Sequence, residues 1–179
     1  LIQSISFSMA FQDVRYYLNG LFIKITSEEI ITVATDGHRL AINSDSVELA
    51  GIQEKEEIEI IIPRKAVTEI EKLCDYTDED LKITFYQQYL KLELKSLQLI
   101  TKLIDGKYPD YKKVIPDQTL TAVKIRRLEL LSCLQRVSVL TADKFRGIKI
   151  HFNKSIITLH STNAEQEEAE EQVQCSGTN

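Results

Sequence analysis

The alternation of apolar and polar positions predicts one structural unit over residues 58–103. An apolar run at Ile58–Ile62 predicts a strand, and it is followed by Pro63, which is suited to the first turn of a helix. Apolar residues between Ala66 and Cys74 then recur at helical spacing. From Leu81 to Leu103 the pattern changes to period two, which predicts three strands. The predicted order of elements in this unit is therefore β-α-β-β-β.

The same order of elements recurs downstream. Leu120–Val123 predicts a short strand, and apolar residues from Leu130 to Val137 predict a helix. Strands are expected at Ile148–Phe152 and Ile156–His160. The acidic segment Glu165–Glu171 consists of residues that favour helices, but it occupies the place of the third strand in the repeat, and we expect a strand there.

A further copy lies upstream and lacks its front. We expect a helix remnant near Leu1–Met9, followed by strands at Leu18–Thr26, Ile30–Ala34 and Arg39–Asn43. The pair Asn19–Gly20 suggests a kink inside the first of these strands. The truncated copy and the absence of a starting methionine suggest an internal fragment of a longer protein.

Three units predict two domains. Residues 1–116 hold two units, and residues 117–179 begin a second domain. The boundary falls in Asp105–Asp117, where glycine, two prolines and several charges are typical of a linker. Antiparallel sheets with amphipathic helices packed on one face make an α+β fold. The basic faces of the helices are expected to point away from the sheets.

Composition narrows the class of protein. Of the 179 residues 43% are hydrophobic, enough for a real core, and the net charge of −5 gives no basic signature over the whole chain. Contact with nucleic acid would have to come from a local basic face. No apolar run approaches the roughly 20 residues that span a bilayer, so no membrane partner is expected. No signal peptide opens the chain, and its three cysteines fit neither a disulfide framework nor a zinc site, which favours a cytoplasmic protein with reduced, packed thiols.

The segment Thr35–Leu40 invites a catalytic interpretation, because Asp36 and His38 lie two residues apart. An Asp-Gly pair between two strands is more typical of a tight turn, and we favour that interpretation. A hydrolase using these two residues remains the alternative. The chain has no nucleophile motif, no metal-ligand spacing and no glycine-rich phosphate loop. We therefore expect neither catalysis nor a cofactor or metal.

Basic residues at the predicted helices offer one candidate binding surface. They could form a solvated surface only, or together a weak, sequence-independent phosphate-facing surface. Arg15-Tyr16-Tyr17 adds cationic and aromatic groups side by side. The helix-associated cations are Arg64, Lys65, Lys72, Arg126, Arg127 and Arg136.

Several motifs carry a resemblance to a known family. These are Phe7–Ala10, Gln12–Gly20, Val33–Ala41, Ile62–Lys65, Lys102–Gly106, Tyr108–Tyr111, Lys144–Gly147 and Glu165–Glu171. In this order they resemble the bacterial β sliding clamps, the processivity subunits of DNA polymerase III. The resemblance implies the DNA clamp fold, with helices facing duplex DNA in a homodimeric ring. It also implies a non-catalytic role in DNA replication. A β-rich interaction domain unrelated to DNA is a third alternative.

The resemblance also implies two sets of site residues. In the family, a pocket binds short linear peptides of partners such as the polymerase α subunit and the clamp loader. Lys113 stands where the family usually has arginine. Residues matching the pocket are Leu18, Thr35, Gly37, His38, Arg39, Leu40, Pro109, Lys113 and Val114. Residues matching positions near the DNA path are Gln12, Arg15, Tyr16 and Tyr17.

Overall fold

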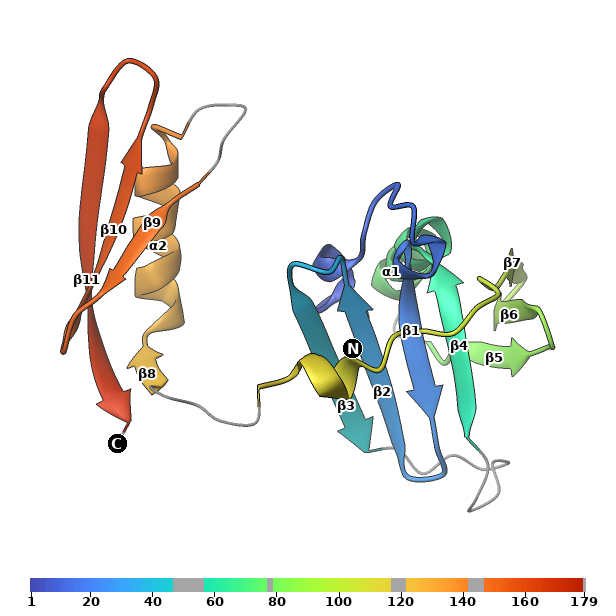
Figure 1. Cartoon of the computed structure of the whole chain (residues 1–179). Helices are drawn as coiled ribbons and strands as arrows, with labels where there is room; N and C mark the ends of the chain where they lie inside the picture. The colour runs from blue at the N-terminus through green and yellow to red at the C-terminus, as the bar shows by residue number, and fades with distance from the viewer. Residues whose placement is uncertain (47–56, 77–78, 117–121, 142–146, 179) are drawn as a thin grey trace. The chain divides into compact units, whose positions relative to one another are not determined.

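The structure is a computed structural model that describes residues 1–46, 57–76, 79–116, 122–141 and 147–178 (Figure 1). It divides into two compact units, Leu1–Val114 and Ile115–Asn179. Among the described residues, no helix is long and apolar enough to cross a membrane.

The first unit begins with two short 3-10 helices and a four-stranded antiparallel sheet. The 3-10 helices are η1 (Ser6–Ser8) and η2 (Tyr16–Leu18). The strands are β1 (Gly20–Ile25), β2 (Glu29–Thr35), β3 (Leu40–Ser46) and β4 (Ile58–Pro63). The sheet order is β3-β2-β1-β4, so β4 pairs with β1, the first strand of the upstream repeat.

The unit continues with a helix and a second, three-stranded sheet. Helix α1 spans Arg64–Tyr76, and β5 (Lys82–Phe85), β6 (Tyr89–Leu94) and β7 (Leu97–Lys102) follow in antiparallel order β5-β6-β7. The last element is η3 (Tyr111–Val114). The first strand of the predicted 58–103 unit thus joins the other sheet, and the two repeats interlock.

The two faces of the four-stranded sheet have different partners. The side chains of Leu21 and Ile62 enter a core with Val67 and Ile70 of α1 and Leu92 of β6. We call this side the inner face. The opposite, outer face is covered by the residues before β1 and by the segment after β7, which crosses the sheet (Figure 1). Its core consists of Ala10, Leu18, Phe22, Val33, Ile61 and Tyr108.

The second unit has one sheet and one helix. Its elements are β8 (Ala122–Ile125), α2 (Arg127–Ser138), β9 (Lys149–Phe152), β10 (Ile156–Thr162) and β11 (Glu168–Thr178), with sheet order β8-β11-β10-β9. Cys133 and Val137 of α2 pack on Leu159 and Val173 of the sheet. The buried Ser161 hydroxyl donates to the Val137 carbonyl at 2.7 Å, which ties the helix end to β10.

Most of the predicted elements are confirmed, and the fold is α+β with helices on one face of antiparallel sheets. The acidic segment is a strand from Glu168 onward. Of the predicted strand Leu120–Val123, residues 120–121 lie outside the described residues, and the strand β8 begins at Ala122. The predicted helix remnant at the start contains only the three-residue η1.

Three detailed expectations are wrong. The pair Asn19–Gly20 does not kink a strand, because β1 begins only at Gly20. Glycine at this position allows close packing, since an added Cβ would lie 2.5 Å from the carbonyl oxygen of Ile62. Cys74 is exposed, since it falls in the last turn of α1 beyond the core, whereas Cys133 and Cys175 are buried as expected. Arg64 is half-buried and does not lie on the outer side of the helix.

Candidate functional site

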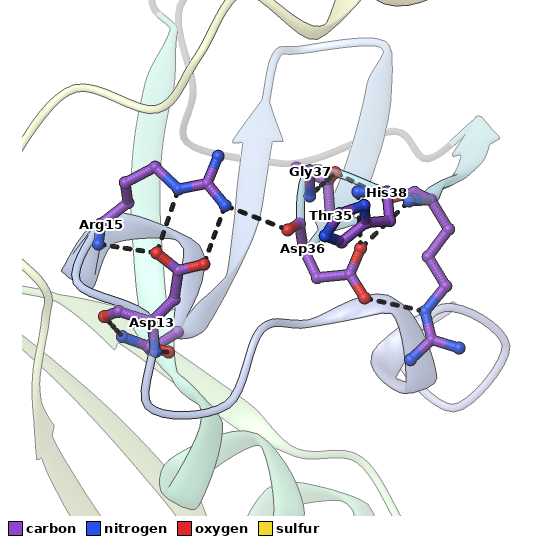
Figure 2. Close-up of polar contacts among 8 residues, drawn as sticks. Asp13, Arg15, Thr35, Asp36, Gly37 and His38 are labelled. Carbon is purple, nitrogen blue, oxygen red and sulfur yellow. Dashed lines mark hydrogen bonds and ion pairs between the residues drawn. The ribbon is translucent and has the colours of Figure 1, made fainter. Parts of the chain in front are cut away.

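The turn between β2 and β3 is fixed by side chains of its own residues (Figure 2). Thr35 Oγ1 donates to the Arg39 carbonyl at 2.6 Å and accepts from the Gly37 N–H at 3.1 Å. Asp36 Oδ1 accepts from the backbone N–H groups of His38 and Arg39 at 2.9 and 3.0 Å. The predicted Asp-Gly turn is confirmed, and Gly37 has φ of +88°, a conformation that favours glycine.

The same geometry argues against the hydrolase alternative. Asp36 accepts from the backbone nitrogen of His38, and its second oxygen accepts from Arg39 Nε at 3.1 Å. These hydrogen bonds, led by the one from the His38 N–H, hold the pKa of Asp36 below its usual value. A carboxylate that is stabilised in its ionised form is a poor proton donor near neutral pH. The pair is arranged as a turn and lacks the geometry of an acid/base dyad.

A second carboxylate lies beside this turn, in the loop before η2. The Arg15 guanidinium donates to both oxygens of Asp13, at 3.0 and 2.8 Å, and to the Asp36 carbonyl at 3.2 Å (Figure 2). The Arg15 contacts lower the pKa of Asp13 to about 2. Asp13 also exchanges two hydrogen bonds with the Asn19 amide, at 2.9 and 2.8 Å. Sequence reasoning missed this network, although the Asp13-x-Arg15 spacing is visible in the sequence.

Two of the predicted pocket leucines share the outer-face core. Leu18 is 2% exposed and packs in that core, and Leu40 is half-buried against it. Leu18 is therefore enclosed in the core, and of these two leucines only Leu40 has surface available for a ligand. The predicted pocket residues of the turn, Thr35 to Arg39, adjoin Leu40 directly because β3 begins there.

Tyr108 is a further buried member of the outer-face core. Its ring stacks on Phe22 with centroids 4.9 Å apart, and the residue is 6% exposed. Burial raises the pKa of its phenol to about 12. The hydroxyl lies near the Thr35 backbone but, among the described residues, has no partner in hydrogen-bond geometry. This buried polar atom was not singled out from the sequence.

The remaining predicted pocket residues lie on the segment after Tyr108. Pro109, Lys113 and Val114 are exposed, and Val114 is 67% accessible. Lys113 forms an ion pair with Asp110 at 3.2 Å. They belong to the same unit as the turn, Leu1–Val114.

The candidate DNA-facing residues fall in both units, and some of their cations form ion pairs within the chain whereas others do not. Arg126 pairs with Glu129, and Arg136 forms a two-pronged pair with Glu171 at 2.6 and 3.1 Å. Within the described ranges, Lys65 and Arg127 are exposed and form no ion pair. Gln12 and Tyr16 are exposed, and Tyr17 packs half-buried against the outer-face core.

Two exposed aromatic rings, each beside an arginine, were also missed from the sequence. The Arg64 guanidinium donates to the Met9 carbonyl at 2.8 Å and lies 5.7 Å from the centroid of the Phe11 ring. This contact explains why Arg64 is half-buried. Arg39 lies in the same way over Phe7, at 5.8 Å. Both rings precede the first strand: Phe7 lies within the predicted helix remnant Leu1–Met9, and Phe11 lies just after it.

The comparison with protein-family models decides the family. The model for the central domain of the DNA polymerase III beta subunit matches residues 1–110. The model for the C-terminal domain of the same subunit matches residues 112–179. The chain belongs to the DNA polymerase III beta subunit family.

Comparison with individual members of this beta subunit family gives the same result. The chain is 37% identical to the beta sliding clamp of Pseudomonas aeruginosa, over 97% of its own length and 47% of the relative's. The crystal structure of the DNA polymerase III subunit beta from the same species matches the whole chain with a TM-score of 0.91 and 36% identity, over 48% of that structure's chain. The chain thus spans about half the length of the curated relatives it matches.

One similar structure contains a bound molecule. A sliding clamp from Pseudomonas aeruginosa bound to griselimycin matches all of this chain and 48% of its own, at a TM-score of 0.87 and 36% identity.

Proposed function

We propose that the protein containing this chain is a sliding clamp, a non-catalytic processivity factor that encircles duplex DNA and tethers the replicative polymerase. The observation that carries the proposal is the pair of consecutive matches to the central and C-terminal domains of the DNA polymerase III beta subunit. The proposed domains are residues 1–116 and 117–179. The division of the structure after Val114 supports a boundary in this region. The expected location is the cytoplasm, and no cofactor or metal is required.

The proposed assembly is a homodimeric ring around duplex DNA, bound without sequence preference. Exposed Lys65 and Arg127 support contacts with phosphates, since affinity of this kind comes from counterion release and falls steeply with salt. Arg64, Arg126 and Arg136 are engaged within the chain and are expected to contribute less than these two. Gln12, Arg15, Tyr16 and Tyr17 complete the proposed DNA-facing set.

The proposed partner site is the surface around the Thr35–Arg39 turn. Leu40 and the exposed Pro109 and Val114 offer apolar contacts, and the turn offers polar groups beside them. Such a surface suits a short linear peptide with leucine or phenylalanine anchors. The polymerase α subunit and the clamp loader are the proposed sources of these peptides. Binding of griselimycin by a related clamp supports a ligand site within the family.

The experiment that tests the ring is topological. The full-length protein is loaded by its clamp loader onto nicked circular DNA, separated from free protein by gel filtration, and the DNA is then cut once. We expect the protein to stay on the circle and to leave the linear form, because a closed ring slides off a free end. Retention that is the same on circular and linear DNA would contradict the proposal.

A further inference from the structure

The turn at the proposed peptide site is held by a residue from another part of the chain. Arg15 comes from the loop before β1, and its Nη2 donates to the Asp36 carbonyl at 3.2 Å. This hydrogen bond joins residues 21 positions apart in the sequence. The internal hydrogen bonds of Thr35 and Asp36 shape the turn, and the Arg15 bond fixes where the turn lies relative to the loop.

The Arg15 guanidinium also packs closely against Gly37. A Cβ added at Gly37 would lie 2.9 Å from Arg15 Nη1 and 3.0 Å from Nη2. Since real Cβ contacts are longer than this, the guanidinium occupies the space that a side chain at position 37 would need. The positive φ favours glycine at position 37, and a side chain there would also displace the Arg15 guanidinium from the turn.

Asp13 determines where the guanidinium points. Both Asp13 oxygens accept from Arg15, and a two-pronged pair of this kind fixes orientation as well as distance. The Asp13 backbone is held in turn by the Asn19 amide through one accepted and one donated hydrogen bond. Gln12, directly before it, has φ of +56°, a strained conformation for a residue other than glycine. The loop is thus held in one conformation, and Arg15 is directed at the turn.

We propose that Asp13 and Arg15 are positioning residues for the peptide site: Asp13 orients Arg15, and Arg15 holds the Asp36–Gly37 turn in the conformation that binds a partner peptide. The inference rests on the proposed peptide-binding function. Neither residue needs to touch the peptide. In this role, the Arg15 guanidinium is committed to the turn, so among the proposed DNA-facing residues Arg15 is expected to contribute little to the affinity for DNA.

The test uses full-length protein with the substitutions Asp13→Asn and Arg15→Lys, alone and combined. Lysine keeps the charge but loses the two-pronged geometry. The probe is a short fluorescein-labelled peptide with a Leu-Phe pair, followed by fluorescence anisotropy. We expect each single variant to bind roughly two- to fivefold more weakly, the range expected for an exposed ion pair. The double variant should bind no more weakly than Arg15→Lys alone, because both residues act through one contact.

A second measurement separates positioning from a general loss of stability. The NMR resonances of the Gly37 and His38 backbone amides should shift in Asp13→Asn. In the described structure, Asp13 shares hydrogen bonds with the side chains of Arg15 and Asn19 only, so such a shift would be transmitted through Arg15. Glu93→Gln is the matched control, because it removes another carboxylate that pairs with a cation, Lys91 at 2.8 Å, on the three-stranded sheet. It should change neither the peptide affinity nor these resonances.

Failure of this inference differs from failure of the peptide site. If Leu40→Asp abolishes peptide binding while Asp13→Asn and Arg15→Lys leave both the affinity and the Gly37 and His38 resonances unchanged, the positioning role is wrong and the site stands. The same is concluded if Arg15→Lys weakens only duplex DNA binding, which would assign Arg15 to DNA. If Leu40→Asp binds the peptide normally, the proposed site itself is wrong, and the positioning role falls with it.

Discussion

The two faces of the sheet β3-β2-β1-β4 bury similar residues but are covered in different ways. A helix and a second sheet cover the inner face, where Leu21 and Ile62 are fully enclosed. Two segments without strands cover the outer face: residues 10–18, which precede β1, and residues 104–111, which follow β7. Regular elements cover the inner face, whereas the loop segments over the outer face leave the end of the sheet at the β2–β3 turn exposed. The candidate peptide site lies at that accessible end, beside the β2–β3 turn.

The inner face should be the more sensitive of the two to loss of volume. Leu21 is 0% exposed, so Leu21→Ala removes buried methyl groups and leaves a cavity. We expect the free energy of unfolding to fall by about 3 kcal/mol, within the range for such changes at a fully buried position. Urea denaturation of the full-length protein followed by circular dichroism measures it. A loss below about 1 kcal/mol would show that the inner face repacks freely.

The outer face contains a buried hydroxyl whose removal should be tolerated. Tyr108→Phe keeps the ring stacked on Phe22 and deletes a phenol oxygen that has no hydrogen-bond partner among the described residues. Because an unsatisfied buried polar group is unfavourable, we expect unchanged or higher stability, by up to about 1 kcal/mol. The same denaturation experiment measures it. A clear loss of stability would show that the hydroxyl is hydrogen-bonded in solution.

The loop that borders the outer face should respond to acid. Pairing with Arg15 lowers the folded-state pKa of Asp13 from 3.8 to about 2, so the pair contributes stability above about pH 4 and loses it as the pH falls toward 2. The stability difference between wild type and Asp13→Asn should therefore be constant from pH 7 to about 5 and shrink at lower pH. Urea midpoints measured across this range test it. A difference that grows as the pH falls would contradict the ion pair.

The strands and helices could be predicted from the sequence because their side-chain periodicity is local. The partner of β4 could not, since pairing with β1 is a contact between two repeats and depends on how their helices and sheets pack. Helical spacing correctly placed Val67 and Ile70 in the core. The same spacing placed Arg64 outside, but its guanidinium donates to the carbonyls of Met9 and Ala10, which lie far earlier in the chain, between η1 and η2.

The candidate site was predictable in part for similar reasons. The Asp36–Gly37 turn has a sequence signature, and the structure has the turn that this signature predicts. The burial of Leu18 has no such signature, because it depends on a core shared with Val33, Ile61 and Tyr108, which come from other parts of the chain. The pairing of Arg15 with both Asp13 and the turn is likewise a tertiary contact. Leu18 is consequently a poor residue for testing the site, since a charge there would disrupt the core.

Leu40 offers the most direct test of the central claim, because it adjoins the turn and is only half-buried. The measurement is a titration of the fluorescein-labelled Leu-Phe peptide into wild-type and Leu40→Asp full-length protein, with circular dichroism as the folding control. Truncating an apolar anchor of an interface typically costs about 2 kcal/mol or more, so we expect a loss of affinity of at least roughly 30-fold in a folded variant. Unchanged affinity in a folded Leu40→Asp protein would contradict the assignment of the peptide site to this surface.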